Sequence, residues 1–271
     1  MPPDKKVTVS VVIPVFNGQE FLEKNLHAVL ALGADEVIVV DDASSDGSAD
    51  FIRKNYSQIK LVQHPTNTRF PTAVNDGFKQ ARGDVVVLLN QDVRPDKELL
   101  KYTLPHFSNS QVFAVTFNEQ VKSWAKAEFK RGFLGYTNGP KDNQPHESFW
   151  ASGGGSAFRK ILWDKLGGFD PIFSPGYFED LDLGWRAHNL GYQIVWEPKC
   201  KIVHEGETSI KKEFNDKKLQ QIKERNYLLA HWKNLQPREW PEHLKSLFLR
   251  IIKSPGYIVP ATLAICRKLV S

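Results

Sequence analysis

The first 90 residues alternate short apolar runs, rich in β-branched side chains, with segments of helical periodicity, and this alternation restricts the fold most strongly. Four such runs predict strands, at residues 9–15, 36–40, 59–63 and 84–89. Between the first two, apolar residues recur at helical spacing from Phe21 to Leu30, and Gly33 ends the helix. Strand–helix–strand units of this length join parallel strands. The pattern therefore predicts an α/β fold with a Rossmann-like, mostly parallel central sheet flanked by helices.

Beyond Asp92 the alternation becomes irregular. Residues 118–150 are rich in Gly, Asn, Lys and aromatic residues without a clear period, which predicts an irregular excursion near a site. The stretch from Ser152 to Ala157, which contains three consecutive glycines, predicts a flexible segment, and a short helix follows it to Leu166. Residues 193–196 and 201–203 predict two further strands.

The C-terminal part is basic and helical in pattern. Residues 211–271 hold 13 Lys/Arg against 5 Asp/Glu, which leaves 23 against 26 in residues 1–210. We therefore expect a body at 1–210 and a basic helical extension at 211–271. The slightly acidic body argues against a nucleic-acid partner, and the tail fits either a solvated end or an anionic membrane surface. Packing on the body and burial in a membrane interface are both open for the apolar stripe Leu244, Leu247, Phe248, Ile251 and Ile252, and for the apolar stretch 257–265 that Pro260 interrupts.

Sequence features that report on the compartment are few. Cys200 and Cys266 lie outside any CxxC pattern, and the N-terminal residues carry no apolar stretch of the secretory type. No run approaches the roughly 20 apolar residues that span a bilayer. We expect a cytoplasmic protein, held peripherally at the inner face of the cell membrane by its tail.

Polar residues follow three of the predicted strands: Asn17, the pair Asp41-Asp42, and Asn90-Gln91-Asp92. Ligands of open parallel sheets bind at these carboxyl ends. There is no GxGxxG and no GxxxxGK[ST], so the diphosphate of a nucleotide would need a divalent cation. Asp92 could bind Mg²⁺ or Mn²⁺, and His204 could complete the site, because imidazole favours Mn²⁺.

A cluster of acids, Glu179, Asp180 and Asp182, stands among aromatic residues rather than among lysines. Carboxylates in apolar surroundings are paired, bind a cation or accept a proton. The alternative is that they stabilise the positive end of a helix running towards His188. Both interpretations stay open from these residues alone.

Six motifs together resemble the family 2 glycosyltransferases of GT-A fold, and the rhamnosyltransferase-like members most closely. The resemblance covers roughly residues 7 to 230. The motifs are Ser10-Val-Val-Ile-Pro-Val-Phe-Asn-Gly18, Val39-Val-Asp-Asp-Ala-Ser-Ser-Asp-Gly-Ser48, Leu88-Leu-Asn-Gln-Asp-Val93, Gly167-Gly-Phe-Asp170, Glu179-Asp-Leu-Asp-Leu183 with Arg186, and Val203-His204.

The resemblance implies a role for each group of residues. Asp180 would be the general base with Glu179 beside it, and Asp92 would bind the metal with His204. The turn at Asn90 to Asp92 stands where the family has its Asp-x-Asp, with Asn90 in place of the first acid. The nucleotide would contact Pro14, Asn17, Asp41, Asp42, Asn67, Arg69, Asn90 and Gln91, and the acceptor would contact Trp150, Gly153 and Gly154.

The function that follows is an inverting, metal-dependent glycosyltransferase with Mn²⁺ or Mg²⁺ as cofactor. Its donor would be a UDP-, dTDP- or GDP-sugar, and its acceptor a hydroxyl of a lipid-linked glycan or a polysaccharide. The alternative is a catalytically weak nucleotide- or glycan-binding module of the same fold, which Asn90 favours. A nucleotidyltransferase would need a glycine-rich and basic phosphate-binding loop after the first strand, and residues 16–20 lack one.

Overall fold

The computed structural model describes residues 6–119, 123–205 and 213–270. The strands are β1 (Val9–Val15), β2 (Glu36–Asp41), β3 (Lys60–Gln63), β4 (Val85–Leu89), β5 (Val93–Pro95), β6 (Val112–Glu119), β7 (Ala125–Lys130), β8 (Phe133–Asn138), β9 (His146–Glu147), β10 (Gly155–Arg159) and β11 (Gln193–His204). The α-helices are α1 (Gln19–Leu30), α2 (Ser48–Asn55), α3 (Phe70–Gln80), α4 (Leu99–Thr103), α5 (Lys160–Leu166), α6 (Glu179–Asn189), α8 (Asp216–Asn234), α9 (Trp240–Lys253) and α10 (Ile258–Val270). Short 3₁₀ turns are η1 (Leu104–Ser108), η2 (Pro171–Phe173), η3 (Pro237–Glu239) and η4 (Pro255–Tyr257).

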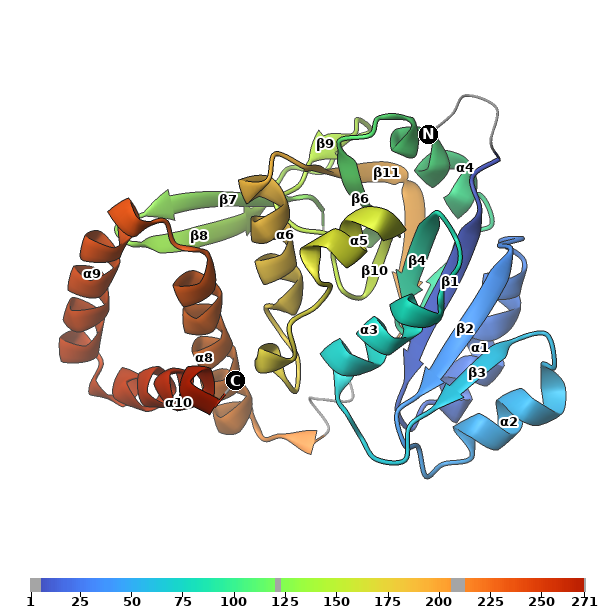
Figure 1. Cartoon of the computed structure of the whole chain (residues 1–271), viewed down its shortest axis with the longest axis horizontal. Helices are drawn as coiled ribbons and strands as arrows, with labels where there is room; N and C mark the ends of the chain where they lie inside the picture. The colour runs from blue at the N-terminus through green and yellow to red at the C-terminus, as the bar shows by residue number, and fades with distance from the viewer. Residues whose placement is uncertain (1–5, 120–122, 206–212, 271) are drawn as a thin grey trace.

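One large sheet forms the centre of the molecule (Figure 1). Its strand order is β3-β2-β1-β4-β10-β6-β11-β5, and β9 pairs with β11. The first four strands are parallel, whereas β10 runs antiparallel to both β4 and β6. The predicted α/β fold with a mostly parallel sheet flanked by helices is confirmed, and the helical C-terminal extension is present.

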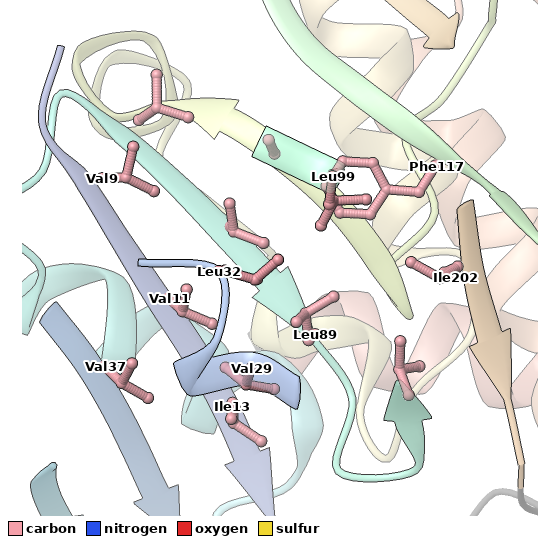
Figure 2. Packing of buried hydrophobic residues seen from close by; sticks show 14 of the residues in the cluster. Val9, Val11, Ile13, Val29, Leu32, Val37, Leu89, Leu99, Phe117 and Ile202 are labelled. Atoms are coloured by element: carbon pink, nitrogen blue, oxygen red, sulfur yellow. The ribbon is translucent and has the colours of Figure 1, made fainter. Parts of the chain in front are cut away.

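Both faces of the sheet are buried, because successive side chains of a strand point to opposite sides. On one face, Val9, Val11 and Ile13 of β1 pack with side chains of α1, α2 and α4 (Figure 2). On the other face, Val12 and neighbouring strand residues pack with α3, α5 and α6. This two-sided burial is the reason that the first strands are continuous apolar runs.

The glycine-rich stretch after Trp150 differs from the prediction of a flexible segment. Its second half belongs to β10, a strand of five buried residues between β4 and β6. A Cβ at Gly155 would lie 2.4 Å from Cδ1 of Ile202, so this glycine permits close packing within the sheet.

Three further predictions need correction. The stretch 118–150 is less irregular than expected, because β7 and β8 form an antiparallel hairpin within it. The two strands expected near residues 193 and 201 are one strand, β11, with an irregularity between Glu197 and Lys201. Pro260 does not interrupt the last helix, because it lies in the first turn of α10, where a helix needs no N–H donor.

The C-terminal helices share a third apolar core with the body. Leu228 and Leu229 of α8 and Ala264 of α10 pack with Leu181 and Trp185 of α6. Polar contacts support this packing, since Asn234 Nδ2 donates to Asp182 Oδ1 at 2.8 Å. The expected domain boundary between residues 210 and 211 lies outside the described residues.

Candidate active site

A cavity of about 280 Å³ opens at the carboxyl ends of β1 and β4. It contains most of the residues that the sequence singled out. Those lining it are Pro14, Asp42, Asn67, Arg69, Asn90, Gln91, Asp92, Gly153, Gly154, Glu179, Asp180 and His204. Parallel strands bring these loops together because they all end at the same edge of the sheet.

Asp92 and His204 face each other in this cavity. Asp92 immediately precedes β5, and His204 ends β11. The two strands are antiparallel neighbours in which His204 pairs with Val93. His204 Nε2 lies 3.0 Å from Asp92 Oδ1, and Nδ1 lies 3.4 Å from Glu119 Oε1. The carboxylates of Asp92 and Glu119 raise the pKa of His204 to about 9. The sequence did not single out Glu119, although it too follows an apolar strand.

The pair fits a divalent cation. Two ligands at right angles, each about 2.1 Å from a cation, lie about 3.0 Å apart, which matches the Asp92–His204 separation. His204 Nε2 is buried and has no aligned hydrogen-bond partner among the described residues. Glu119 on Nδ1 is the kind of carboxylate that orients a metal-binding imidazole. No group of three or more described His, Cys, Asp or Glu residues could hold an ion, so further ligands would be phosphate oxygens and water.

Gln91 ties two strand ends together. Its Oε1 accepts a hydrogen bond from the Phe16 amide at 3.0 Å, and its Nε2 donates to the Phe16 carbonyl at 3.4 Å. A Cβ at Gly18 would lie 2.3 Å from Gln91 Oε1, so the close approach requires glycine. Asn90 lies beside this turn, and its Oδ1 is buried without a hydrogen-bond partner among the described residues.

Asp42 holds the loop that carries Asn67 and Arg69. Its carboxylate accepts hydrogen bonds from the amides of Thr68 at 2.7 Å and Arg69 at 2.8 Å, and His64 Nδ1 lies 2.8 Å away. Arg69 has φ of 77°, a strained value that these contacts stabilise. Its guanidinium pairs with Glu213, another cavity-lining residue that the sequence did not indicate, at 2.5 Å.

Three of the expected site residues do not line the cavity. Asp41 is fully buried behind it, and Asn17 Oδ1 instead accepts from the Ser45 amide at 2.8 Å. Trp150 is half-buried, and its ring meets Tyr136 edge-on at 5.5 Å. These residues support the loops around the cavity from outside.

The acid cluster divides into three environments. Asp182 is fully buried and pairs with Arg186 at 2.8 Å, so it serves packing. Glu179 is also buried, and burial together with the charge of Asp180 raises its pKa well above the usual range. Asp180 is half-buried at the N-terminus of α6, and its Oδ2 accepts from the Gly153 amide at 3.3 Å. The helix-start interpretation holds for the position of the acids, but it does not account for the cavity around them.

Gly153 and Gly154 stand between the two groups of acidic side chains. A Cβ at Gly153 would lie 3.6 Å from Glu179 Oε1, and one at Gly154 would lie 3.2 Å from His204 Cε1. Consecutive Cα atoms are about 3.8 Å apart. The Asp92–His204 pair and the Glu179–Asp180 pair therefore lie close to adjacent glycines of the same cavity.

Asn226 of α8 holds the loop before Glu179. Its Nδ2 donates to the carbonyls of Phe173 at 2.7 Å, Gly176 at 3.0 Å and Tyr177 at 3.0 Å, and it is fully buried. The loop it fixes contributes Tyr177 and Phe178 to the cavity, each with a positive φ of 73°. Only the tertiary structure brings Asn226 to this loop, since about 50 residues separate them in the chain.

The sequence of this chain has relatives among characterised proteins, and its structure has neighbours among solved structures. The chain is 27% identical over 203 residues to the poly-β-1,6-N-acetyl-D-glucosamine synthase of Staphylococcus epidermidis. The aligned region covers 71% of this chain and 48% of that protein. The chain thus spans about half the length of this curated relative.

Solved structures share the fold. A mannosyltransferase of Pyrobaculum calidifontis, in complex with GDP-Man and Mn²⁺, matches with a TM-score of 0.63 and 18% identity over 99% of this chain and 77% of that one. GalNAc-T7 with UDP, GalNAc and Mn²⁺ matches with a TM-score of 0.68 and 15% identity over 84% of this chain and 48% of that one. The family model "Glycosyl transferase family 2" matches residues 10–167, more than half of the sequence. The chain belongs to glycosyl transferase family 2, and its fold is GT-A.

Proposed function

We propose that this protein transfers a sugar from a nucleoside-diphosphate sugar to an acceptor hydroxyl, with inversion at the anomeric carbon. The observation that carries the proposal is the single cavity in which Asp180 and the Asp92–His204 pair lie on either side of Gly153-Gly154. A base on one side of a sugar and a diphosphate site on the other suit direct displacement. The sugar leaves the diphosphate as the acceptor oxygen attacks from the opposite face.

Asp180 is the proposed general base. A sugar hydroxyl is too weakly acidic to attack unaided, and a carboxylate within hydrogen-bond reach takes its proton as the new bond forms. Asp180 is half-buried and lines the cavity, so an acceptor can reach it. Glu179 is buried behind it with a raised pKa, which keeps a second negative charge from developing beside the base.

Asp92 and His204 are the proposed holders of Mn²⁺ or Mg²⁺, and Glu119 would orient the imidazole. A bound cation would neutralise the charge that grows on the departing diphosphate. Asp92 and Glu119 raise the pKa of His204, so the carboxylates around the imidazole favour a positive charge there, which a bound cation would supply. The Mn²⁺ present in the two structural neighbours supports this proposal.

The proposed donors are UDP-, dTDP- and GDP-sugars. The two structural neighbours were solved with UDP and with GDP-Man. Asn90 stands in place of the first acid of the Asp-x-Asp motif, as in the rhamnosyltransferase-like members that the sequence resembles. This resemblance adds a dTDP-deoxyhexose to the proposed donors. Asn67, Arg69 and Asn90 would contact the nucleotide, while Asp42 and Gln91 position their loops.

The proposed acceptor is a lipid-linked glycan or a polysaccharide, and the basic tail would hold the protein peripherally at the inner face of the membrane. The name of the poly-β-1,6-N-acetyl-D-glucosamine synthase supports a glycan acceptor. None of the described helices is both long enough and apolar enough to cross a bilayer. The region 211–271 would then act at the surface of the membrane.

Calorimetric titration of UDP, GDP and dTDP, with and without Mn²⁺, tests the proposal. We expect one nucleotide to bind in the presence of Mn²⁺ and to lose at least about ten-fold affinity in Asp92→Ala. Asp164→Ala, which removes an exposed carboxylate on α5, is the matched control and should bind like the wild type.

Turnover separates the enzyme from the binding module. Release of nucleoside diphosphate from the matching sugar nucleotide should fall by about 10² to 10⁴ in Asp180→Asn, with nucleotide affinity unchanged. Nucleotide binding that is indifferent to Mn²⁺ and to Asp92 would contradict the metal site. Binding without any turnover in the wild type would favour the binding module instead.

A further inference from the structure

The exposed apolar side chains of this protein are concentrated on two helices. Of the twelve large hydrophobic residues that the described part of the chain exposes, nine lie on α9 and α10. Phe248 is 64% exposed and Leu269 is 82% exposed. Isolated exposed apolar residues are ordinary, whereas a cluster of this kind marks a surface that another apolar phase covers. The nine are Leu244, Phe248, Leu249, Ile252, Ile258, Val259, Leu263, Ile265 and Leu269.

The cluster has a helical pattern on both elements. On α9, Leu244, Phe248 and Ile252 are exposed at intervals of four residues, whereas His243 is buried. On α10, Ile258, Ile265 and Leu269 are exposed, whereas Ala261 and Ala264 pack into the third core. Each helix therefore has one face against the body and one apolar face directed outward. Figure 1 shows that α9 and α10 form a corner at one end of the molecule.

The charges on these helices decide what covers the face. Helices α9 and α10 contain five Lys/Arg against one acid, Glu242. Arg250 pairs with Glu224, and Arg267 and Lys268 donate to backbone carbonyls of the body, whereas Lys245 and Lys253 are exposed. A second copy of the chain docked on the same face would bring two surfaces of net positive charge together, which is unfavourable. A bilayer with anionic lipids meets both requirements, because its acyl region takes the apolar side chains and its headgroups pair with Lys and Arg.

We propose that the outward faces of α9 and α10 dock on an anionic lipid bilayer. We call these nine apolar residues the docking face. The helices lie in the interface, because no described helix could cross a bilayer. Lys245 and Lys253, both exposed on α9, extend their ammonium groups to the headgroups while the neighbouring Phe248 and Ile252 enter the acyl boundary.

Docking on a bilayer favours one of the two proposed acceptors, a lipid-linked glycan, over the other, a polysaccharide. This choice of acceptor rests on the proposed function. A cleft lined by Tyr136, Phe178, Lys223 and Arg250 lies between α9 and the catalytic cavity, and Phe178 lines both. In Figure 1, α10 lies along the edge of the molecule at which β1 ends. Because the cleft connects α9 to the cavity that holds Asp180, a bilayer on the docking face would present a lipid-linked glycan to that cavity.

Flotation with vesicles tests the inference on the full chain. The probes are phosphatidylcholine vesicles with and without 30% phosphatidylglycerol, in about 0.1 and 0.5 M salt. We expect the wild type to float only with phosphatidylglycerol and less at high salt. The double variant Phe248→Ser/Ile252→Ser should lose at least about ten-fold in partition coefficient.

A matched control removes equally exposed apolar side chains elsewhere. Ile161 is 72% exposed and Leu190 is 57% exposed, against 64% and 58% for Phe248 and Ile252. Ile161→Ser/Leu190→Ser should float like the wild type. Circular dichroism checks that both variants fold.

Several outcomes would overturn the inference. One is a wild type that ignores anionic vesicles, and another is a Phe248→Ser/Ile252→Ser variant that floats unchanged. If sedimentation velocity shows that the wild type is a dimer and that only the Phe248→Ser/Ile252→Ser variant is a monomer, the docking face belongs to a second copy. Titration with nucleotide in the presence of vesicles tests the placement: unchanged affinity is expected, and its loss would refute an accessible cavity. Nucleotide that fails to bind even without vesicles would refute the proposed function while the docking result stands.

Discussion

Lowering the pH should weaken the attachment of the β7–β8 hairpin to α8 through one buried imidazole. His231 is fully buried, its Nδ1 donates to the Tyr227 carbonyl at 2.7 Å, and its Nε2 accepts from the Leu134 amide at 2.8 Å. A second proton on Nε2 would therefore point at an N–H group. Burial lowers the pKa of His231 from 6.5 to about 3.

The size and sign of the effect follow from proton linkage. Between pH 6.5 and 3 the unfolded chain binds a proton at His231 that the folded protein does not, so stability falls as the pH falls through this window. Integration from pH 7 to pH 5 gives a loss of about 2 kcal/mol in the free energy of unfolding. The strand that His231 holds through the Leu134 amide, β8, also carries Tyr136, which lines the cleft next to the cavity.

Urea unfolding of the wild type and of His231→Gln at pH 7 and pH 5 measures the effect. The variant lacks this titration, so the wild type should lose about 2 kcal/mol more than the variant over the interval. His27→Gln, on the exposed side of α1, is the control and should follow the wild type. Equal losses in the wild type and His231→Gln would refute a neutral, buried His231 and with it the hairpin contact.

Three further substitutions probe the packing around the cavity, each by urea unfolding. Asn226→Ala should cost about 3 kcal/mol, because the loop loses the buried amide that bonds the carbonyls of Phe173, Gly176 and Tyr177; a loss under about 1 kcal/mol would contradict this contact. Arg186→Met should cost about 2 kcal/mol at pH 7, because the fully buried Asp182 loses its cation at 2.8 Å and keeps only Lys233 at 3.5 Å, and an unchanged stability would exclude the Arg186–Asp182 pair. Gly155→Ala should cost about 1 to 3 kcal/mol by overpacking, whereas Gly256→Ala, with open space around it, should change little.

The parallel strands and the positions of the strand-end residues followed from the sequence because both depend on local patterns. Two-sided burial makes β1 and β4 continuous apolar runs, and a parallel strand must end where its neighbours end. This is why Asp42, Asn90 and Asp92 could be placed at one edge before any coordinates were known. The resemblance to a family then supplied roles that the spacing alone left open.

The region between residues 118 and 160 could not be predicted in the same way. The hairpin β7–β8 lies outside the main sheet. Its first strand, Ala125–Lys130, alternates apolar and charged residues, but its second, Phe133–Asn138, is largely exposed and does not alternate, so the pairing is not evident from a local window. Gly155 is a core residue because Ile202, some 47 positions away, leaves no room for a side chain. Such a constraint is invisible in a local window.

What the sequence by itself determined about this protein is its α/β class, its parallel half and the set of polar strand ends, because these arise from contacts between near neighbours and from periodicity. What the tertiary structure decided is which acids are available for chemistry. Asp182 is neutralised by Arg186, and Glu179 is buried, while Asp180 remains at the cavity. Burial and pairing depend on residues from distant helices such as α8, so three carboxylates that are equivalent in the sequence acquire different environments only when the chain folds.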